Sequence, residues 1–117
     1  MLTVAEKLKY IRESIENVKS FYRVRIDPAS RYRIKAEGGG PFEYPPAVVF
    51  EFSEEFVEDS DFLKLREFLE EAIDIGKERL SNPPLPKYHF QGWVKVTKNG
   101  ACFTPRNETE RRQKGTC

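Results

Sequence analysis

Basic side chains recur at alternate positions in two short segments of the chain, residues 21–27 and 31–36. If both segments are β-strands joined by a turn, alternation places these side chains on one face of each strand. Like charges directly opposite each other on two strands destabilise the pair, so this face needs an anion. The phosphates of a nucleic acid would supply it. The basic residues concerned are Arg23, Arg25, Arg31, Arg33 and Lys35.

Aromatic side chains accompany these cations. Trp93 lies near Lys95 in the sequence, and a hairpin over residues 88–106 would bring Arg106 opposite it. Unpaired bases stack on such rings, a contact worth roughly 1–3 kcal/mol per base. Cations along a backbone with aromatic rings under the bases are typical of a single-strand site. The other aromatic residues of the predicted site are Phe21, Phe42 and Tyr44.

Each of these residues also has an ordinary structural interpretation. Cations on an exposed sheet face are often solvated, or pair with acids elsewhere in a highly charged protein. Trp93 could instead be covered by a second layer or by a dimer contact. Phe42 and Tyr44 could be lids on the core. Phenylalanines that are assigned to the core by default are Phe50, Phe52, Phe62, Phe68 and Phe90.

The sequence offers little for catalysis or metal binding. His89 is the only histidine and has no evident nucleophile partner, so we expect neither an enzyme nor a metal site. The glycines at 38–40 lack the Lys-Ser/Thr of a phosphate-binding loop. Two cysteines, Cys102 and Cys117, argue against a disulfide framework, and Cys102 is interpreted as a small strand side chain. The acids at 54–61 lack the spacing of a calcium loop. No cofactor is expected.

The formal charge of +1 hides opposed blocks of charge. Residues 19–35 hold six basic and one acidic side chain, and residues 87–114 hold seven and two. Residues 51–78 hold three basic and eleven acidic side chains. Both basic blocks contain the segments that are predicted to form hairpins, so the distribution of charge, unlike its sum, favours a polyanionic partner.

Two amphipathic helices are predicted from apolar residues at steps of three and four. The first begins at Thr3, where Thr3 and Glu6 form a capping box, and extends to Val18. The second follows the acids at 59–61 and ends before the proline-rich residues 82–86.

Two hairpins are predicted from turn residues between β-compatible segments. Around Asp27-Pro28-Ala29-Ser30, an odd-length loop would pair Arg25 with Arg33 and Arg23 with Lys35. Around Asn99-Gly100, a two-residue loop would pair Lys98 with Ala101 and Trp93 with Arg106. Tyr22, Val24 and Ile26 would then face the core, and so would Tyr88 and Phe90.

These elements predict one α+β domain over residues 1–106, followed by a polar tail over 107–117. We expect a four- to five-stranded, largely antiparallel sheet with two helices packed on one face, in the order αββ–βα–ββ. The apolar segment 47–52 is the candidate central strand. The other face of the sheet is the predicted site.

The basic strands, the phenylalanine-rich segment 42–62 and the charge-rich, thermophile-like composition resemble one family, the ThermoDBP single-stranded DNA-binding proteins of hyperthermophilic archaea. The resemblance covers most of the chain and implies a cleft lined by phenylalanines, with Phe42, Phe50, Phe52, Phe56 and Phe62 as candidates, flanked by basic residues. The sequence lacks that family's carboxy-terminal leucine zipper, which leaves dimerisation open.

A second class of function is structural. Small virion tail and connector proteins have a similar order of elements, with a strand after a segment like Pro45-Pro46-Ala47-Val48-Val49, and opposed charge blocks suit head-to-tail contacts in rings. In either case no apolar stretch approaches the about 18 residues of a spanning helix. The amino terminus also lacks the apolar region of a signal peptide. We therefore expect a soluble cytoplasmic protein whose partner is single-stranded DNA or RNA, or a second copy of itself, and not a membrane.

Overall fold

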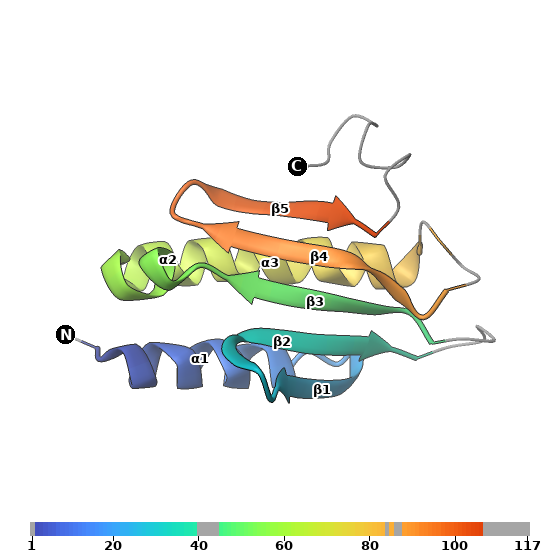
Figure 1. Ribbon diagram of the computed structural model, residues 1–117, viewed down its shortest axis with the longest axis horizontal. Helices are drawn as coiled ribbons and strands as arrows, with labels where there is room; N and C mark the ends of the chain where they lie inside the picture. Colours follow the sequence, from blue (N-terminus) through green and yellow to red (C-terminus); the bar gives the residue numbers. More distant parts are fainter. Residues whose placement is uncertain (1, 40–44, 84, 86–87, 107–117) are drawn as a thin grey trace.

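The computed structural model describes residues 2–39, 45–83, 85 and 88–106. In this part of the chain three helices and five strands form one layer of sheet and one layer of helices (Figure 1). The elements are α1 (Val4–Glu16), β1 (Phe21–Asp27), β2 (Ser30–Gly38), β3 (Ala47–Phe52), α2 (Glu54–Asp59), α3 (Phe62–Ser81), β4 (Phe90–Thr97) and β5 (Gly100–Pro105).

The sheet has the strand order β1-β2-β3-β4-β5. Neighbouring strands are antiparallel except β3 and β4, which are parallel. A parallel pair needs a crossover connection, and α2 and α3 supply it. Figure 1 shows the helices behind the sheet, with α1 packed on β1 and β2 and α3 on β3 to β5. The predicted α+β class is confirmed, with one more helix than expected.

Each helix begins at a side-chain cap. Thr3 and Glu6 form the predicted capping box, with both hydrogen bonds at 3.1 Å. Asp61 accepts from the Lys64 amide at 2.8 Å and starts α3. Ser53 accepts from the Phe56 amide and starts α2, a six-residue helix that the periodicity of the segment did not predict.

The core contains a chain of phenylalanine rings between the sheet and α3. Rings of Phe50, Phe52 and Phe56 are stacked with centroids 6.3–6.4 Å apart, and all three residues are buried. Phe68 extends the row at 6.0 Å from Phe56. The prediction that Phe62 lies in the core is wrong, because the residue is 45% exposed; its ring lies 5.0 Å from that of Tyr10 in α1.

The β1–β2 register differs from the predicted one by two residues. Arg25 lies opposite Lys35 and Arg23 opposite Glu37, where the prediction placed Arg33 and Lys35. An irregularity between Ile26 and Asp27 allows the turn to close at Asp27–Ser30. Because the shift is even, each residue keeps its face of the sheet. Neither of the two predicted like-charge pairs exists, and a different one, Arg25 opposite Lys35, takes their place.

A second irregularity, between Phe21 and Arg23, reverses the side of the first residues of β1. Phe21 is therefore buried, 5% exposed, with its ring 5.7 Å from that of Phe50. Tyr22 is the residue that turns outward, with 79% of its surface exposed. The predictions that Phe21 faces a ligand and that Tyr22 faces the core are both wrong, since a bulge shifts alternation by one residue. Ile26, also predicted for the core, is partly exposed.

The β4–β5 register also differs by two residues. Thr97 pairs with Gly100, so the turn centres on Lys98 and Asn99 and not on Asn99-Gly100. The Thr97 hydroxyl accepts from the Asn99 amide at 3.2 Å, and Gly100 supplies a φ of +125° directly after the turn. Trp93 consequently lies opposite Thr104 and not Arg106.

Some predicted features lie outside the described residues: Phe42 and Tyr44 after the glycines, and the tail over 107–117. Among the helices that are described, none is long and apolar enough to cross a membrane.

Candidate nucleic-acid interface

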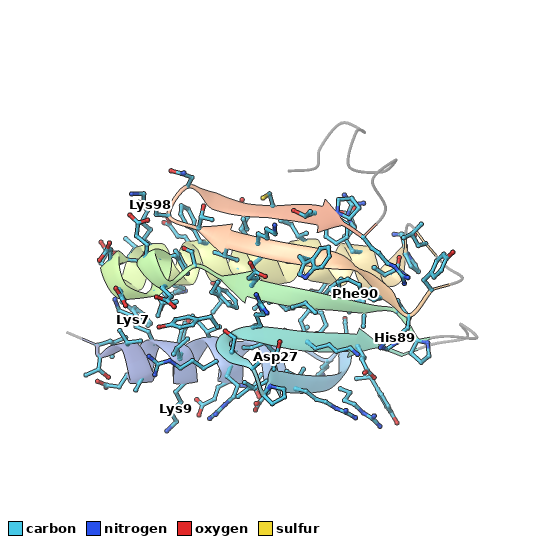
Figure 2. All side chains as sticks on the ribbon, viewed as in Figure 1. Lys7, Lys9, Asp27, His89, Phe90 and Lys98 are labelled. Carbon is cyan, nitrogen blue, oxygen red and sulfur yellow. The ribbon has the colours of Figure 1, made fainter. Side chains whose placement is uncertain are left out.

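The face of the sheet opposite the helices, called the open face below, is turned toward the viewer in Figures 1 and 2. Strand pairing arranges its side chains in rows that run across the strands. The central row crosses all five strands in register. It consists of Arg25, Lys35, Val49, Trp93 and Thr104.

Two further rows flank the central one. The row nearer the β1–β2 turn consists of Arg33, Glu51, Lys95 and Cys102. The row on the other side consists of Arg23, Glu37, Ala47 and Phe90. The open face thus brings together six of the predicted site residues. They are Arg23, Arg25, Arg33, Lys35, Trp93 and Lys95.

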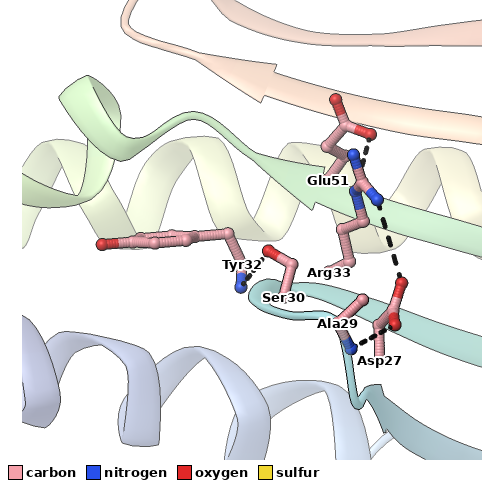
Figure 3. Close-up of polar contacts among 6 residues, drawn as sticks. All are labelled: Asp27, Ala29, Ser30, Tyr32, Arg33 and Glu51. Atoms are coloured by element: carbon pink, nitrogen blue, oxygen red, sulfur yellow. Dashed lines mark hydrogen bonds and ion pairs between the residues drawn. The ribbon is translucent and has the colours of Figure 1, made fainter.

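Acidic residues on the same face engage some of these cations. Figure 3 shows Arg33 between two carboxylates, with Nε 3.3 Å from Glu51 Oε2 and Nη1 3.9 Å from Asp27 Oδ2. Lys35 Nζ lies 3.7 Å from Glu37 Oε1. The interpretation that cations of this face pair within the protein is therefore correct for Arg33 and Lys35, although acids of the strands, not of the helix segment, are the partners.

The other cations of the open face differ from Arg33 and Lys35. Among the described residues, Arg23, Arg25 and Lys95 form no ion pair within 4.0 Å. Arg23 and Arg25 are exposed, and Lys95 is half-buried. Arg25 additionally faces the like charge of Lys35 directly across β1 and β2. Positive charge therefore collects toward β1, at one side of the sheet.

Aromatic surface collects at the other side. Phe90 and Trp93 of β4 form an edge-to-face pair with ring centroids 4.8 Å apart, and both are half-buried. Edge-to-face packing is one of the arrangements that aromatic pairs prefer, and it joins the two rings into one aromatic surface on β4. Val49 lies between Trp93 and Lys35 and joins the aromatic and basic parts of the central row.

Two predicted site residues lie away from this arrangement. Arg31 stacks over the Tyr32 ring at 5.3 Å and lines a hollow with Lys9 and Arg12 of α1. Arg106, beyond the end of β5, stacks over the Tyr88 ring at 4.6 Å. The prediction that Tyr88 faces the core is wrong, because half of its surface is exposed.

The sequence argument missed several members of the open face. Val49, Glu51 and Glu37 alternate with buried residues along their strands, so strict alternation could have placed them there. Phe90 was assigned to the core, but its ring contacts Trp93 and the residue pairs with Ala47 near a bulge. No simple pattern predicts a residue beside a bulge.

The groups that bear on catalysis or metal binding lie at the edges of the open face. His89 Nδ1 is 2.6 Å from the Pro45 carbonyl oxygen, and its Nε2 is 3.7 Å from Glu37 Oε1. Within the described ranges, no three His, Cys, Asp or Glu side chains are grouped so as to hold a metal ion. Cys102 is disulfide-bonded, so its interpretation as only a small side chain is wrong. The other cysteine, Cys117, lies outside the described residues.

No family model, no curated protein and no solved structure matches the chain.

Proposed function

We propose that the open face binds single-stranded DNA or RNA with little dependence on sequence, and that the protein acts by binding and not by catalysis. In this proposal the phosphates lie over the basic side of the face, near Arg23, Arg25 and Lys35. The bases stack against Phe90 and Trp93. Lys95 contributes a further cation between the acids and the aromatic pair.

One observation carries the proposal: on the open face, cations of β1 and β2 share their rows with the aromatic rings of β4. A single strand presents charge along one side and flat bases along the other, so this separation matches its chemistry. The acids Asp27 and Glu51 share Arg33 as their counter-ion, which offsets part of their charge. Arg33 is accordingly a counter-ion for these acids. The phosphate contacts are assigned to Arg23, Arg25 and Lys35, of which Lys35 also has Glu37 at 3.7 Å.

The test is a titration of a labelled single-stranded 20-mer, with anisotropy and Trp93 fluorescence read at several salt concentrations. Tight binding should be accompanied by quenching of Trp93, the only tryptophan. Replacing Arg25 and Lys35 together by Gln should reduce the slope of log Kobs against log[salt] by about 0.7 for each phosphate that these two cations neutralise.

A charge-matched control is available on the rest of the surface. Lys19 and Lys77 are exposed and lie off the open face. Replacing both by Gln removes the same formal charge, yet should leave the slope unchanged. If the two double variants reduce the slope equally, the protein attracts nucleic acid by its overall charge and the open face is not the site.

Self-association is a second candidate function, favoured by an exposed apolar pair. Phe62 and Leu63, at the start of α3, are 45% and 64% exposed, and Phe62 lines a hollow with the preceding acids Glu58, Asp59 and Asp61. The hollow that Arg31 lines with Lys9 and Arg12 measures about 330 Å³ and also includes apolar side chains. One copy could place the acidic apolar pair on this basic hollow of another. Light scattering over a concentration series tests this: the mass should rise with concentration, and Leu63→Glu should abolish the rise.

A further inference from the structure

A small hollow opens on the open face beside the β1–β2 turn. It measures about 260 Å³ and is called the turn hollow below. Pockets that enclose a drug-sized ligand measure about 300–1,000 Å³, so this one suits a smaller group. Its lining residues are Arg25, Ile26, Asp27, Pro28, Lys35 and Val49.

The cations of the turn hollow are held close together by the strands. Arg25 and Lys35 are direct partners across β1 and β2, which brings their Cβ atoms to within about 5.5 Å. Arg25 has no carboxylate within 4.0 Å in the described part of the chain, and Lys35 has Glu37 at 3.7 Å. An anion between the two side chains would turn a repulsive pair into two charge-assisted contacts.

Asp27 also lines the turn hollow, but its carboxylate is occupied. Oδ1 accepts from the Ala29 amide at 2.8 Å, and Oδ2 lies 3.9 Å from Arg33 Nη1 (Figure 3). These contacts close the turn and compensate the charge of Asp27. Among the residues that line the turn hollow, two cations, Arg25 and Lys35, therefore stand against one acid, Asp27.

The remaining walls of the turn hollow are apolar, and they lead toward the aromatic pair. Val49 follows Lys35 in the central row and Trp93 follows Val49. Strands are spaced about 4.8 Å apart, so Lys35 and Trp93 lie about 10 Å from each other. Pro28 and Ile26 complete a lining that suits the apolar edge of a sugar.

We infer that the turn hollow is a phosphate subsite that holds one phosphodiester of the bound strand between Arg25 and Lys35. The sugar lies over Val49 and the base reaches Trp93. This inference rests on the proposed single-strand function and adds the orientation of the bound strand on the open face. The backbone follows β1 and β2, while the bases point across the sheet toward β4.

The test uses small probes whose binding does not require a long strand. ¹H–¹⁵N spectra of the full chain are recorded during titration with inorganic phosphate, thymidine or the dinucleotide TpT, which contains one phosphodiester. Phosphate should cause saturable shifts confined to Ala29, Lys35, Val49 and the Arg25 side chain. TpT should shift these signals and the Trp93 indole, whereas thymidine should leave the turn hollow unchanged.

Variants of Arg25 and Lys35 test whether these two cations bind the phosphate. Replacing Arg25 and Lys35 together by Gln should weaken phosphate and TpT binding by about a hundredfold, about tenfold for each of the two charged hydrogen bonds lost. The Arg25→Lys, Lys35→Arg exchange keeps both charges and should retain binding. The Gln double variant should also unfold at a temperature no lower than that of the parent protein, since it removes a like-charge pair.

The experiments distinguish a wrong assignment of the phosphate subsite from a wrong proposal of single-strand binding. Shifts that spread over the surface without saturating, or binding that survives the Gln double variant, would overturn the subsite even if the 20-mer binds. A saturable phosphate response together with no 20-mer binding would instead support the turn hollow as a phosphate site and refute single-strand binding.

Discussion

Gly76 shows how one missing side-chain atom sets the distance between α3 and the sheet. It lies inside α3, where glycine is normally unfavourable compared with alanine by about 1 kcal/mol. A Cβ at this position would lie 2.6 Å from Cζ of Phe50 and 3.3 Å from Cζ of Phe21. The helix therefore approaches the phenylalanine rings more closely than any other residue would permit.

Gly76→Ala should consequently destabilise the protein although it improves helix propensity. Overpacking a core costs roughly 1–3 kcal/mol, which exceeds the gain of about 1 kcal/mol from propensity. Urea denaturation should show a net loss of about 1 kcal/mol in the free energy of unfolding. The control is Gly39→Ala, where the nearest atom to an added Cβ is 3.7 Å away, and which should be almost neutral. A stabilised Gly76→Ala would mean that Phe50 moves aside easily.

At the scale of elements, a buried lysine joins α1 to the end of α2. Lys7 is only 6% exposed, and its Nζ donates to the carbonyl oxygens of Ser60 at 2.7 Å and Glu58 at 3.1 Å. Carbonyls at the end of a helix lack partners within it, so Lys7 satisfies groups that would otherwise remain unpaired. In Figure 2 Lys7 lies between the two helices, whereas Lys9 points away from them.

Lys7→Met should therefore destabilise the protein far more than Lys9→Met. Methionine retains the apolar stem of Lys7 but leaves two carbonyls without their donor, at a cost of roughly 1–3 kcal/mol. Lys9 is exposed and forms only an ion pair with Glu13 at 4.0 Å, so its substitution should change stability by less than about 0.5 kcal/mol. Thermal unfolding of the two variants compares them directly, and equal losses would contradict the proposed role of Lys7.

The capping box of α1 makes part of the stability of the protein depend on pH. Hydrogen bonds from the backbone and side chain of Thr3 lower the pKa of Glu6 below its ordinary value of 4.5. Because the folded pKa lies below the unfolded one, the stabilisation is complete above the unfolded value and is lost as the pH falls through the folded pKa. Thr3→Val removes the side-chain hydrogen bond but keeps the backbone N–H, the larger cause, so the pKa of Glu6 should rise only part of the way toward 4.5 in an NMR titration of its carboxyl carbon. An unchanged pKa would show that the hydroxyl of Thr3 contributes nothing to the shift.

Local patterns predicted the existence of most elements, and contacts distant in sequence decided the rest. The capping box, the helix over 62–81 and both hairpins follow from residues near one another in the chain. The bulge that buries Phe21 and the two-residue register shifts depend on how β1 and β5 fit their neighbours. The short helix α2 ends at carbonyls held by Lys7, 53 residues from Ser60.

The candidate site was predictable to a similar degree. The alternation of side chains along each strand was enough to place Arg25, Lys35 and Trp93 on the open face. A register shift of two residues does not move a side chain to the other face of the sheet. Which cation meets which acid required the register itself. Arg33, for example, meets Glu51 through the pairing of β2 with β3, which the sequence does not specify.

At the scale of the whole molecule, the placement of all three described helices on one side determines what the other side can bind. The open face consists of strands, and no described helix projects from it into a groove. The open face therefore cannot recognise a duplex by placing a helix in its major groove. The rows of the central sheet offer instead a surface on which phosphates and unpaired bases can lie side by side.

Single strands should accordingly compete for the open face better than duplexes of the same sequence. In a duplex the bases are paired and stacked, so they cannot reach Phe90 and Trp93, and only phosphate contacts remain. With stacking worth roughly 1–3 kcal/mol per base, unlabelled single strand should displace the labelled 20-mer about tenfold more effectively than duplex at equal phosphate concentration. Trp93→Leu should reduce that advantage while leaving the salt slope unchanged. Equal competition by both forms would mean that the open face binds by charge alone and that the aromatic pair serves only to cover the sheet.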